Sequence, residues 1–264
     1  MNNTIKSILV LGLFFSGLGS AFAQTKVDPN FELYILIGQS NMAGRGLITP
    51  EFRDVAPPRV WMLAKDNQWV PAKHPLHFDK PKSAGLGPGL AFGIDMAEGN
   101  PGVKIGLIPC AVGGTPIEHW EPGAFDQATK THPYDDAMLR IKAAMKYGII
   151  KGIIWHQGEA NSSPQGAKFY LTKLDSLIQR IRAAVGNPRL PVVVGELGRY
   201  RERYALINAQ LAKVPALIPY AELASSAGLV HKGDSTHFDG PSANLLGQRF
   251  AEKMKELQKI KKLP

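Results

Sequence analysis

Apolar residues gather in short runs along the chain, and five of these runs resemble strands. They are Leu33–Ile37, Val103–Ile108, Ile149–Trp155, Pro191–Gly195 and, more weakly, Ile218–Leu223. Each is almost continuously apolar, as strands covered on both faces must be. The pattern therefore predicts a sheet that is buried between two layers of helices.

Between the strand-like runs, apolar residues recur at helical spacing. One such stripe consists of Tyr170, Leu174, Leu177, Ile178 and Ile181, with Gly186 placed to end the helix. A second helix is expected to open at Pro241 and to bury Ala243, Leu246, Phe250 and Leu257. Strands that alternate with helices indicate a central parallel sheet in a three-layer α/β/α sandwich. Such folds carry their chemistry at the carboxyl ends of the strands.

Residues 48–89 depart from this alternation. The segment is rich in proline and holds two short strand-like pieces, Val60–Leu63 and Gln68–Val70, joined through Asp66-Asn67. We expect a small hairpin inserted over the sheet. Long irregular insertions often shape a binding site.

The first residues read as an export signal. Lys6 precedes the apolar run Ile8–Leu18, and Ala21-Phe22-Ala23 offers the small residues that a signal peptidase reads, which predicts cleavage before Gln24. The apolar run is shorter than the roughly 20 residues that a membrane span needs. We expect residues 1–23 to be a signal peptide, residues 24–264 to be one domain, and the mature protein to be secreted or periplasmic without a membrane span.

Composition excludes several classes. The 264 residues are 44% hydrophobic and 20% charged, which does not fit a disordered chain or a coiled coil. The single cysteine, Cys110, cannot form an internal disulfide, so an exported domain must rely on its core. The formal charge of +9 is scattered except in the last helix, Lys253–Lys262, which reads as a solvated face. No nucleic-acid motif accompanies it, and no nucleic-acid partner is expected.

Polar residues follow the predicted strands at the points where they stop. Gly38–Gly44 places Ser40 at a strand-to-helix turn, Cys110–Thr115 supplies paired glycines, and Trp155–Glu159 brings an amide and a carboxylate. Near the C-terminus, Asp234 stands three residues before His237. A serine nucleophile, a general base, a carboxylate to orient it and several N–H donors are the parts of a serine hydrolase site.

The Gly-x-Ser-x-Gly elbow of α/β-hydrolases is absent, because Met42 stands where its second glycine would be. The chain resembles instead the SGNH, or GDSL-like, hydrolase superfamily, whose fold is flavodoxin-like. Within it, the chain is similar to the sialate O-acetylesterase-like domain and to the family-six carbohydrate esterases, which include acetylxylan esterases. The resemblance rests on Gly38–Gly44, on Gly113-Gly114-Thr115 with Trp120, on His156–Glu159, and on Asp234 with His237.

The resemblance implies that Ser40 attacks an acetyl carbonyl while His237 takes its proton. The backbone N–H of Ser40, an N–H of Gly113 or Gly114, and the Gln157 amide are then expected to stabilise the oxyanion. Either Asp234, which is local to His237, or Glu159, which arrives from another strand, could orient the ring. The expected substrate contacts are Gln39, Asn41, Trp120 and His156.

No metal or other cofactor is expected, because His74 and His77 have no acidic or cysteine partner nearby. The predicted partner is an acetylated carbohydrate, with acetylated xylan as the first substrate class. Three alternatives stay open. One is O-acetylated sialic acid, and another is a glycan-binding module that kept the fold and lost turnover. The third is a peptidoglycan or lipid deacylase, which should act on longer acyl chains.

Overall fold

The computed structural model describes residues 27–260, and the predicted signal peptide lies outside this range. Its strands are β1 (Phe31–Gly38), β2 (Val60–Leu63), β3 (Trp69–Pro71), β4 (Lys104–Pro109), β5 (Ile149–His156), β6 (Val192–Gly195) and β7 (Ala221–Ala224). Its longer helices are α3 (Gly89–Gly99), α4 (Pro133–Ala144), α6 (Tyr170–Val185), α7 (Tyr204–Leu211) and α9 (Gly240–Ile260). Shorter helical segments are α1 (Ser40–Ala43), α2 (Pro50–Arg53), η1 (Ile117–Trp120), η2 (Glu159–Asn161), α5 (Pro164–Lys168) and α8 (Val214–Leu217).

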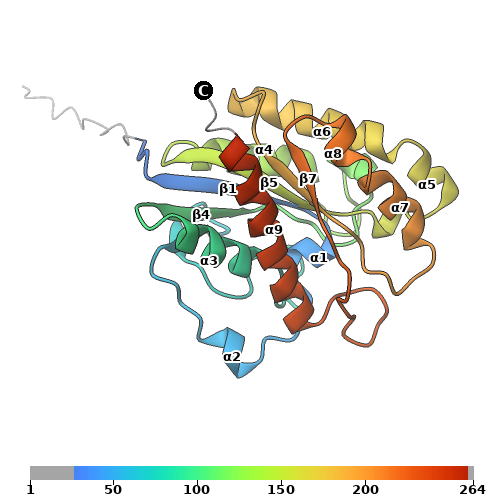
Figure 1. The fold of residues 1–264 in the computed structure, drawn as a ribbon, viewed down its shortest axis with the longest axis horizontal. Helices are drawn as coiled ribbons and strands as arrows, with labels where there is room; N and C mark the ends of the chain where they lie inside the picture. Colours follow the sequence, from blue (N-terminus) through green and yellow to red (C-terminus); the bar gives the residue numbers. More distant parts are fainter. Residues whose placement is uncertain (1–26, 261–264) are drawn as a thin grey trace, which may run out of the picture.

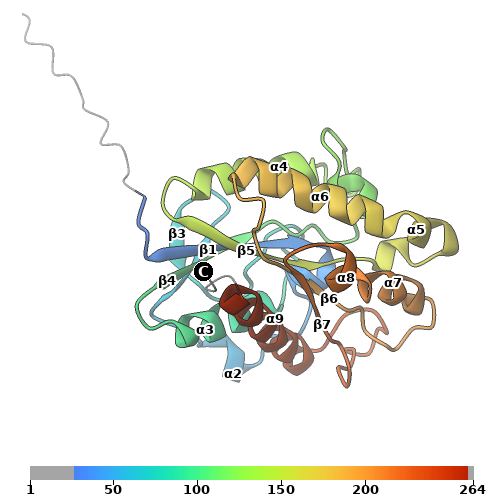
Figure 2. The same ribbon diagram turned by 45° about the horizontal axis from the view of Figure 1, so that its top comes forward.

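The strands form one seven-stranded sheet in the order β3-β2-β4-β1-β5-β6-β7, and every pairing except β2 with β3 is parallel. Helices α4 and α6 cover one face, and α3 and α9 cover the other (Figures 1 and 2). The predicted three-layer α/β/α sandwich is therefore confirmed.

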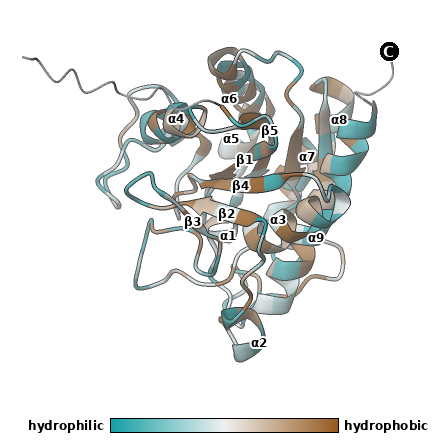
Figure 3. Cartoon of the chain, turned by 90° about the vertical axis from the view of Figure 1, so that its left-hand side faces the viewer, coloured by the Kyte–Doolittle hydropathy of each residue, from teal (hydrophilic) through white to brown (hydrophobic). Residues whose placement is uncertain are grey.

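Side chains of β1 show how the sheet separates two cores. Leu33, Ile35 and Ile37 pack toward α4 and α6, whereas Tyr34 and Leu36 pack toward α3 and α9. Figure 3 shows hydrophobic colours along β4 and its neighbouring strands, which lie between the two helical layers. This burial on both faces is the reason why the strands read as continuous apolar runs.

The start of the last strand and the position of the hairpin differ most from the sequence prediction. Ile218 follows α8 rather than opening the last strand, and β7 begins only at Ala221. The predicted hairpin exists, with Trp61 paired to Pro71 and Leu63 to Trp69. It does not lie over the sheet, because β2 also pairs in parallel with β4 and so extends the sheet at its edge. The prediction of an inserted hairpin above the sheet was wrong.

The order of connection places a switch point at β1. The chain runs from β1 to β2 and β4 on one side, then crosses to β5, β6 and β7 on the other. In open α/β sheets, ligands bind outside the carboxyl ends of the strands at such a switch point. Ser40 follows β1 at this place.

Candidate active site

The serine turn is shaped by a close approach between β1 and β5. Gly38 has a φ of 134°, and a Cβ on it would lie 2.1 Å from the carbonyl oxygen of His156. The next residue, Gln39, donates its N–H to that same oxygen at 2.9 Å. Only glycine fits at the end of this strand, and the chain then turns at once into the single turn of α1, which begins with Ser40.

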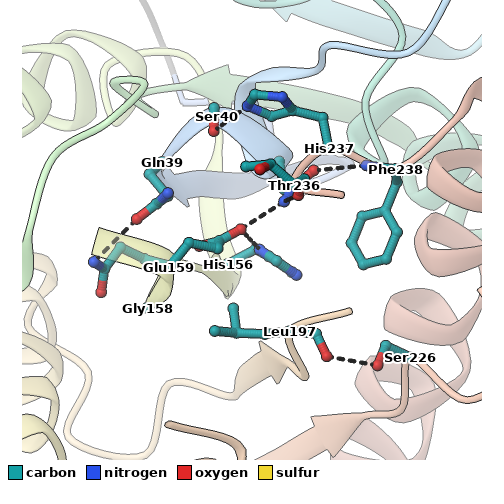
Figure 4. Close-up of polar contacts among 12 residues, drawn as sticks. Gln39, Ser40, His156, Gly158, Glu159, Leu197, Ser226, Thr236, His237 and Phe238 are labelled. Atoms are coloured by element: carbon teal, nitrogen blue, oxygen red, sulfur yellow. Dashed lines mark hydrogen bonds and ion pairs between the residues drawn. The ribbon is translucent and has the colours of Figure 1, made fainter. Parts of the chain in front are cut away.

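The loop before α9 brings a histidine onto this serine. The Oγ of Ser40 and the Nε2 of His237 are 3.0 Å apart, although 197 positions separate the two residues (Figure 4). The Nδ1 of His237 lies 2.7 Å from Oδ2 of Asp234. Because an ionised carboxylate only accepts, the ring proton belongs on Nδ1, and Nε2 is left to accept the serine proton.

The carboxylate of Asp234 also shapes the loop. Its Oδ1 accepts the backbone N–H groups of Thr236 at 2.9 Å and of His237 at 2.8 Å. Burial raises the pKa of the Asp234 carboxyl, but hydrogen bonds from the His237 backbone, the His237 ring and the Thr236 backbone outweigh it and hold the pKa well below its ordinary value. The group that faces the His237 ring is therefore ionised at neutral pH.

Glu159, the other candidate to orient His237, is directed elsewhere. Its side chain is only 4% exposed, and its Oε1 accepts from Nδ2 of Asn41 at 2.5 Å and lies 3.7 Å from Nδ1 of His156. Figure 4 shows Glu159 next to His156, while Ser40 faces His237. Of the two carboxylates, Asp234 is the one that the fold brings to the ring.

Gly113, from the predicted pair of glycines, lies beside Ser40, and its backbone N–H is bound by a carboxylate. A Cβ on Gly113 would be 3.4 Å from the Cβ of Ser40 and 2.4 Å from a guanidinium nitrogen of Arg45, so a larger residue would not fit. The N–H of Gly113 donates to Oδ2 of Asp79 at 2.7 Å, and Arg45 donates to the same oxygen at 2.6 Å. The Gly113 N–H is therefore not available to an oxyanion in this arrangement.

Arg45 and Asp79 form a buried ion pair, with side chains 5% and 2% exposed. Burial raises the pKa of Asp79, but the charge and hydrogen bond of Arg45 and the Gly113 N–H reverse this, and the net pKa is lowered. Sequence reasoning missed both residues. Arg45 directly follows the Gly38–Gly44 block and could have been suspected, whereas Asp79 lies in the irregular insertion and gives no signal of its own.

The Gln157 amide does not reach the pocket. It is fully buried, and its Nε2 lies within hydrogen-bond distance of Oε1 of Gln39 at 3.1 Å, the carbonyl of Thr115 at 3.1 Å and Oδ1 of Asn161 at 2.8 Å. Its donors are thus taken by the framework. The expected oxyanion contact from Gln157 is not formed, because the amide ties the strand ends together beneath the site.

Three expected substrate contacts also need correction. Trp120 is fully buried against Trp155, with ring centroids 5.6 Å apart, and it belongs to the core. His156 is fully buried as well, with Nε2 3.2 Å from the carbonyl of Glu196, and burial lowers its pKa. Asn41 is 3% exposed and its amide is engaged by protein groups. Of the four, only Gln39 lines the cleft that contains Ser40.

Comparison with known proteins shows the family. Residues 30–256 match the family described as "carbohydrate esterase, sialic acid-specific acetylesterase". The chain belongs to this carbohydrate esterase family. It is thus a carboxylic ester hydrolase. A probable carbohydrate esterase of Arabidopsis thaliana is 31% identical over 253 residues, which cover 87% of this chain and 92% of the plant protein.

Solved structures agree with this membership. The X-ray structure of the Arabidopsis protein superposes with a TM-score of 0.74 at 29% identity, covering 87% of this chain and 99% of that one. The structure of NanS gives 0.72 at 17% identity, covering 89% and 100% of the two chains. That of XAC1771, a carbohydrate acetylesterase from Xanthomonas citri, gives 0.64 at 22% identity, covering 89% and 57%. The last two show a shared fold.

In this esterase, Ser40 and His237 open onto a cleft of about 470 Å³. Gly113, Gly114 and the acidic residues Glu159 and Asp234 contribute to its walls. Four cationic side chains, which sequence reasoning also missed, line it: Arg45, Lys80, Arg203 and Lys232. A second cleft of about 500 Å³ lies along α4 and the segment 77–81, and Ser40, Asp234 and His237 are not among its lining residues. The first cleft is therefore the candidate active site.

Between residues 27 and 260, no three His, Cys, Asp or Glu side chains come together as metal ligands would. No helix within the same range has the length and apolar character needed to cross a bilayer.

Proposed function

We propose that this esterase removes O-acetyl groups from carbohydrates through an acetyl-serine intermediate on Ser40. The observation that carries the proposal is the hydrogen-bonded series from Ser40 through His237 to Asp234, with distances of 3.0 and 2.7 Å. A nucleophile, a base and a carboxylate in this order are the working parts of serine acyl transfer.

The reaction proceeds in two halves. Oγ of Ser40 bonds to the acetyl carbonyl carbon as its proton passes to Nε2 of His237, and the Asp234 carboxylate stabilises the imidazolium that results. The tetrahedral intermediate collapses, the bond from carbon to the sugar oxygen breaks, and His237 returns the proton to that oxygen. A water molecule then attacks the carbonyl carbon of the acetyl-serine as its proton passes to Nε2 of His237. The second tetrahedral intermediate collapses, the bond from the carbon to Oγ of Ser40 breaks, His237 returns the proton to Oγ, and acetate leaves.

Two backbone groups support the oxyanion in this proposal. The N–H groups of Ser40 and Gly114 have no hydrogen-bond acceptor within residues 27–260, and both residues line the cleft. The N–H of Ser40 also stands at the start of a helical turn. Removing one oxyanion donor typically costs about 10²–10³ in rate.

The sugar is a separate question from the triad. Acetylated xylan is the substrate class that the sequence suggests, and O-acetylated sialic acid is a second candidate that a specific observation favours. Arg203 and Lys232 are exposed, Lys80 is half-buried, and all three line the cleft. Lys232 lies 3.8 Å from Oδ2 of Asp234, and the carboxylates of Asp234 and Glu159 also contact His237 and Asn41, so Lys80 and Arg203 are the cations that these carboxylates do not engage. Such positive charge raises the local concentration of an acidic sugar.

The proposal is tested by acetate release from a chromogenic acetyl ester, from acetylated xylan and from O-acetylated sialic acid. We expect release by the wild type and a loss of at least 10³ in Ser40→Ala. Glycan binding with no serine-dependent release would instead identify a binding module. A Lys80→Gln/Arg203→Gln variant should lose kcat/KM on the sialic acid ester and keep it on the neutral ester, if the positive side chains of the cleft select acidic sugars.

We also propose export, since the sequence of residues 1–23 has the features of a signal peptide. Expression of the whole chain in a bacterial host, followed by N-terminal sequencing of the periplasmic protein, should give Gln24 as the first residue. An intact N-terminus in the cytoplasmic fraction would contradict this.

A further inference from the structure

The side chain of Asn41 bridges the backbone on both sides of His237. Its Nδ2 donates to the carbonyl of Thr236 at 3.0 Å, and its Oδ1 accepts the N–H of Phe238 at 3.1 Å. Asn41 directly follows Ser40 on the single turn of α1. One amide therefore connects the segment that carries the nucleophile to the two peptide groups that flank the base.

Glu159 fixes the orientation of this amide. Its Oε1 accepts the second Nδ2 proton of Asn41 at 2.5 Å. Both neighbours of Nδ2 are acceptors and the neighbour of Oδ1 is a donor, so only one assignment of the amide satisfies all three groups. Glu159 begins η2, two residues after the end of β5, which is the neighbour of β1 in the sheet. Its position is therefore set by the framework rather than by the loop of His237.

We propose that Asn41 and Glu159 are positioning residues that hold His237 against Ser40, and that Glu159 acts through Asn41. This inference rests on the proposed function, because it assigns roles in serine acyl transfer. Misplacing a catalytic group by about 1 Å can cost about 10²-fold in rate. The amide bridge opposes such a shift at the two backbone positions nearest the imidazole.

The loop retains other attachments when the bridge is removed, so a variant is expected to fold. The hydroxyl of Tyr200 donates to the carbonyl of Thr236 at 3.0 Å, and the guanidinium of Arg201 donates to the carbonyl of Ser235 at 2.5 Å. These contacts come from the segment after β6 and do not involve α1. They keep the loop in place without fixing its distance from the nucleophile.

The test measures Asn41→Ala against the control Ser226→Ala, and Glu159→Leu against Glu159→Gln. All four variants are made in the full chain and assayed with a chromogenic acetyl ester. Asn41→Ala removes the bridge, and Glu159→Leu removes the acceptor that orients it. Each should lower kcat by about 10–100-fold and leave KM within about twofold. Glu159→Gln keeps an oxygen that accepts from Asn41, so it should restore kcat to within about threefold of the wild type.

Ser226→Ala serves as the matched control. Ser226 is fully buried, like the bridge, and its hydroxyl donates to the carbonyl of Leu197 at 2.8 Å. Figure 4 shows this contact apart from Ser40 and His237. Ser226→Ala should lower the melting temperature without changing kcat, whereas a purely structural role for Asn41 would give Asn41→Ala the same behaviour and would overturn the inference.

Two other results would also overturn it. If Glu159→Gln were as damaging as Asp234→Asn, Glu159 would act on the charge of His237 rather than through Asn41. If Asn41→Ala raised KM and left kcat unchanged, Asn41 would contact the substrate instead.

A readout that does not depend on turnover separates this inference from the proposed function. In crystal structures of the wild type and Asn41→Ala, the distance from Oγ of Ser40 to Nε2 of His237 should increase from about 3 Å to beyond hydrogen-bond range. An unchanged distance would refute the bridge even in an active enzyme. Absence of serine-dependent acetate release by the wild type would refute the esterase proposal and leave the distance measurement valid.

Discussion

Replacing Asp234 by asparagine should impair the enzyme strongly although the two side chains have nearly the same size. The reason is that the hydrogen bonds of the loop fix the orientation of the new amide. In the wild type, Oδ1 receives two backbone N–H groups, from Thr236 and His237, and Oδ2 faces Nδ1 of His237 at 2.7 Å. An amide nitrogen cannot accept the two backbone donors. The asparagine oxygen must therefore take the position of Oδ1, and the NH₂ group must face the imidazole.

The ring then has to accept at Nδ1, so the neutral imidazole carries its proton on Nε2. That proton points at Ser40 Oγ, and the histidine can no longer take the serine proton. A wrong tautomer of this kind costs up to about 10⁴ in kcat in a Ser-His-Asp triad. Asp234 is 37% exposed at its side chain, so water can partly relieve the mismatch. We expect a loss of about 10³, which corresponds to about 4 kcal/mol of activation free energy.

The assay is kcat/KM for a chromogenic acetyl ester at neutral pH, with Asp234→Ala as the comparison. Alanine removes the carboxylate without presenting a donor to Nδ1, so water can solvate the ring and the loss should be smaller than for asparagine. A loss of less than tenfold in Asp234→Asn would refute the tautomer argument. If kcat/KM of Asp234→Ala were lower than that of Asp234→Asn by tenfold or more, the main contribution of Asp234 would be its hydrogen bonds to the loop backbone and not the orientation of the His237 ring.

Three further predictions follow from other parts of the structure. Gly113→Ala places a Cβ 2.4 Å from the guanidinium nitrogen of Arg45 that pairs with Asp79, and it should lower kcat on the same ester about 10–100-fold. Full activity would show that the ion pair can shift without harm. Trp120→Leu should lower the free energy of unfolding by about 2–4 kcal/mol in a urea titration, and the kcat of the folded fraction should stay unchanged. A selective rise in KM would show instead that Trp120 contacts the substrate. Burial lowers the pKa of His74 and of His77 to about 4, so between about pH 6.5 and 4 the unfolded chain binds protons that the folded chain does not. The free energy of unfolding should therefore fall on acidification by up to about 1.4 kcal/mol per pH unit for each histidine. His74→Gln or His77→Gln should flatten the plot of melting temperature against pH in that window. An unchanged slope would count against a buried neutral ring.

Sequence patterns predicted the sheet well because its strands are buried on both faces. Short, nearly continuous apolar runs such as Ile149–Trp155 are typical of strands that are covered on both faces. The αL cap at Gly186, with a φ of 72°, ends α6 where the helical periodicity stops. The edge of the sheet was less predictable. Strand β2 is short and irregularly flanked, so its parallel pairing with β4 depends on contacts between distant segments.

The same division holds for the site. Local patterns marked Ser40, His237, Asp234 and Glu159 as candidates, because each stands where a predicted strand stops or just before a helix. The choice between the two carboxylates could not be made from spacing. Asp234 reaches the ring through the turn of its own loop, whereas Glu159 lies in the framework and faces Asn41.

The sequence by itself determined the α/β architecture and the family, and it marked the candidate residues for acyl transfer, because these depend on periodicity and on short local motifs. Only the tertiary structure decided which carboxylate faces His237, that Asp79 occupies the Gly113 N–H, and that Trp120 and Gln157 are buried in the framework. The physical reason is that hydrogen-bond partners and burial are set by three-dimensional packing between segments as far apart as Ser40 and His237, and no local pattern encodes that packing.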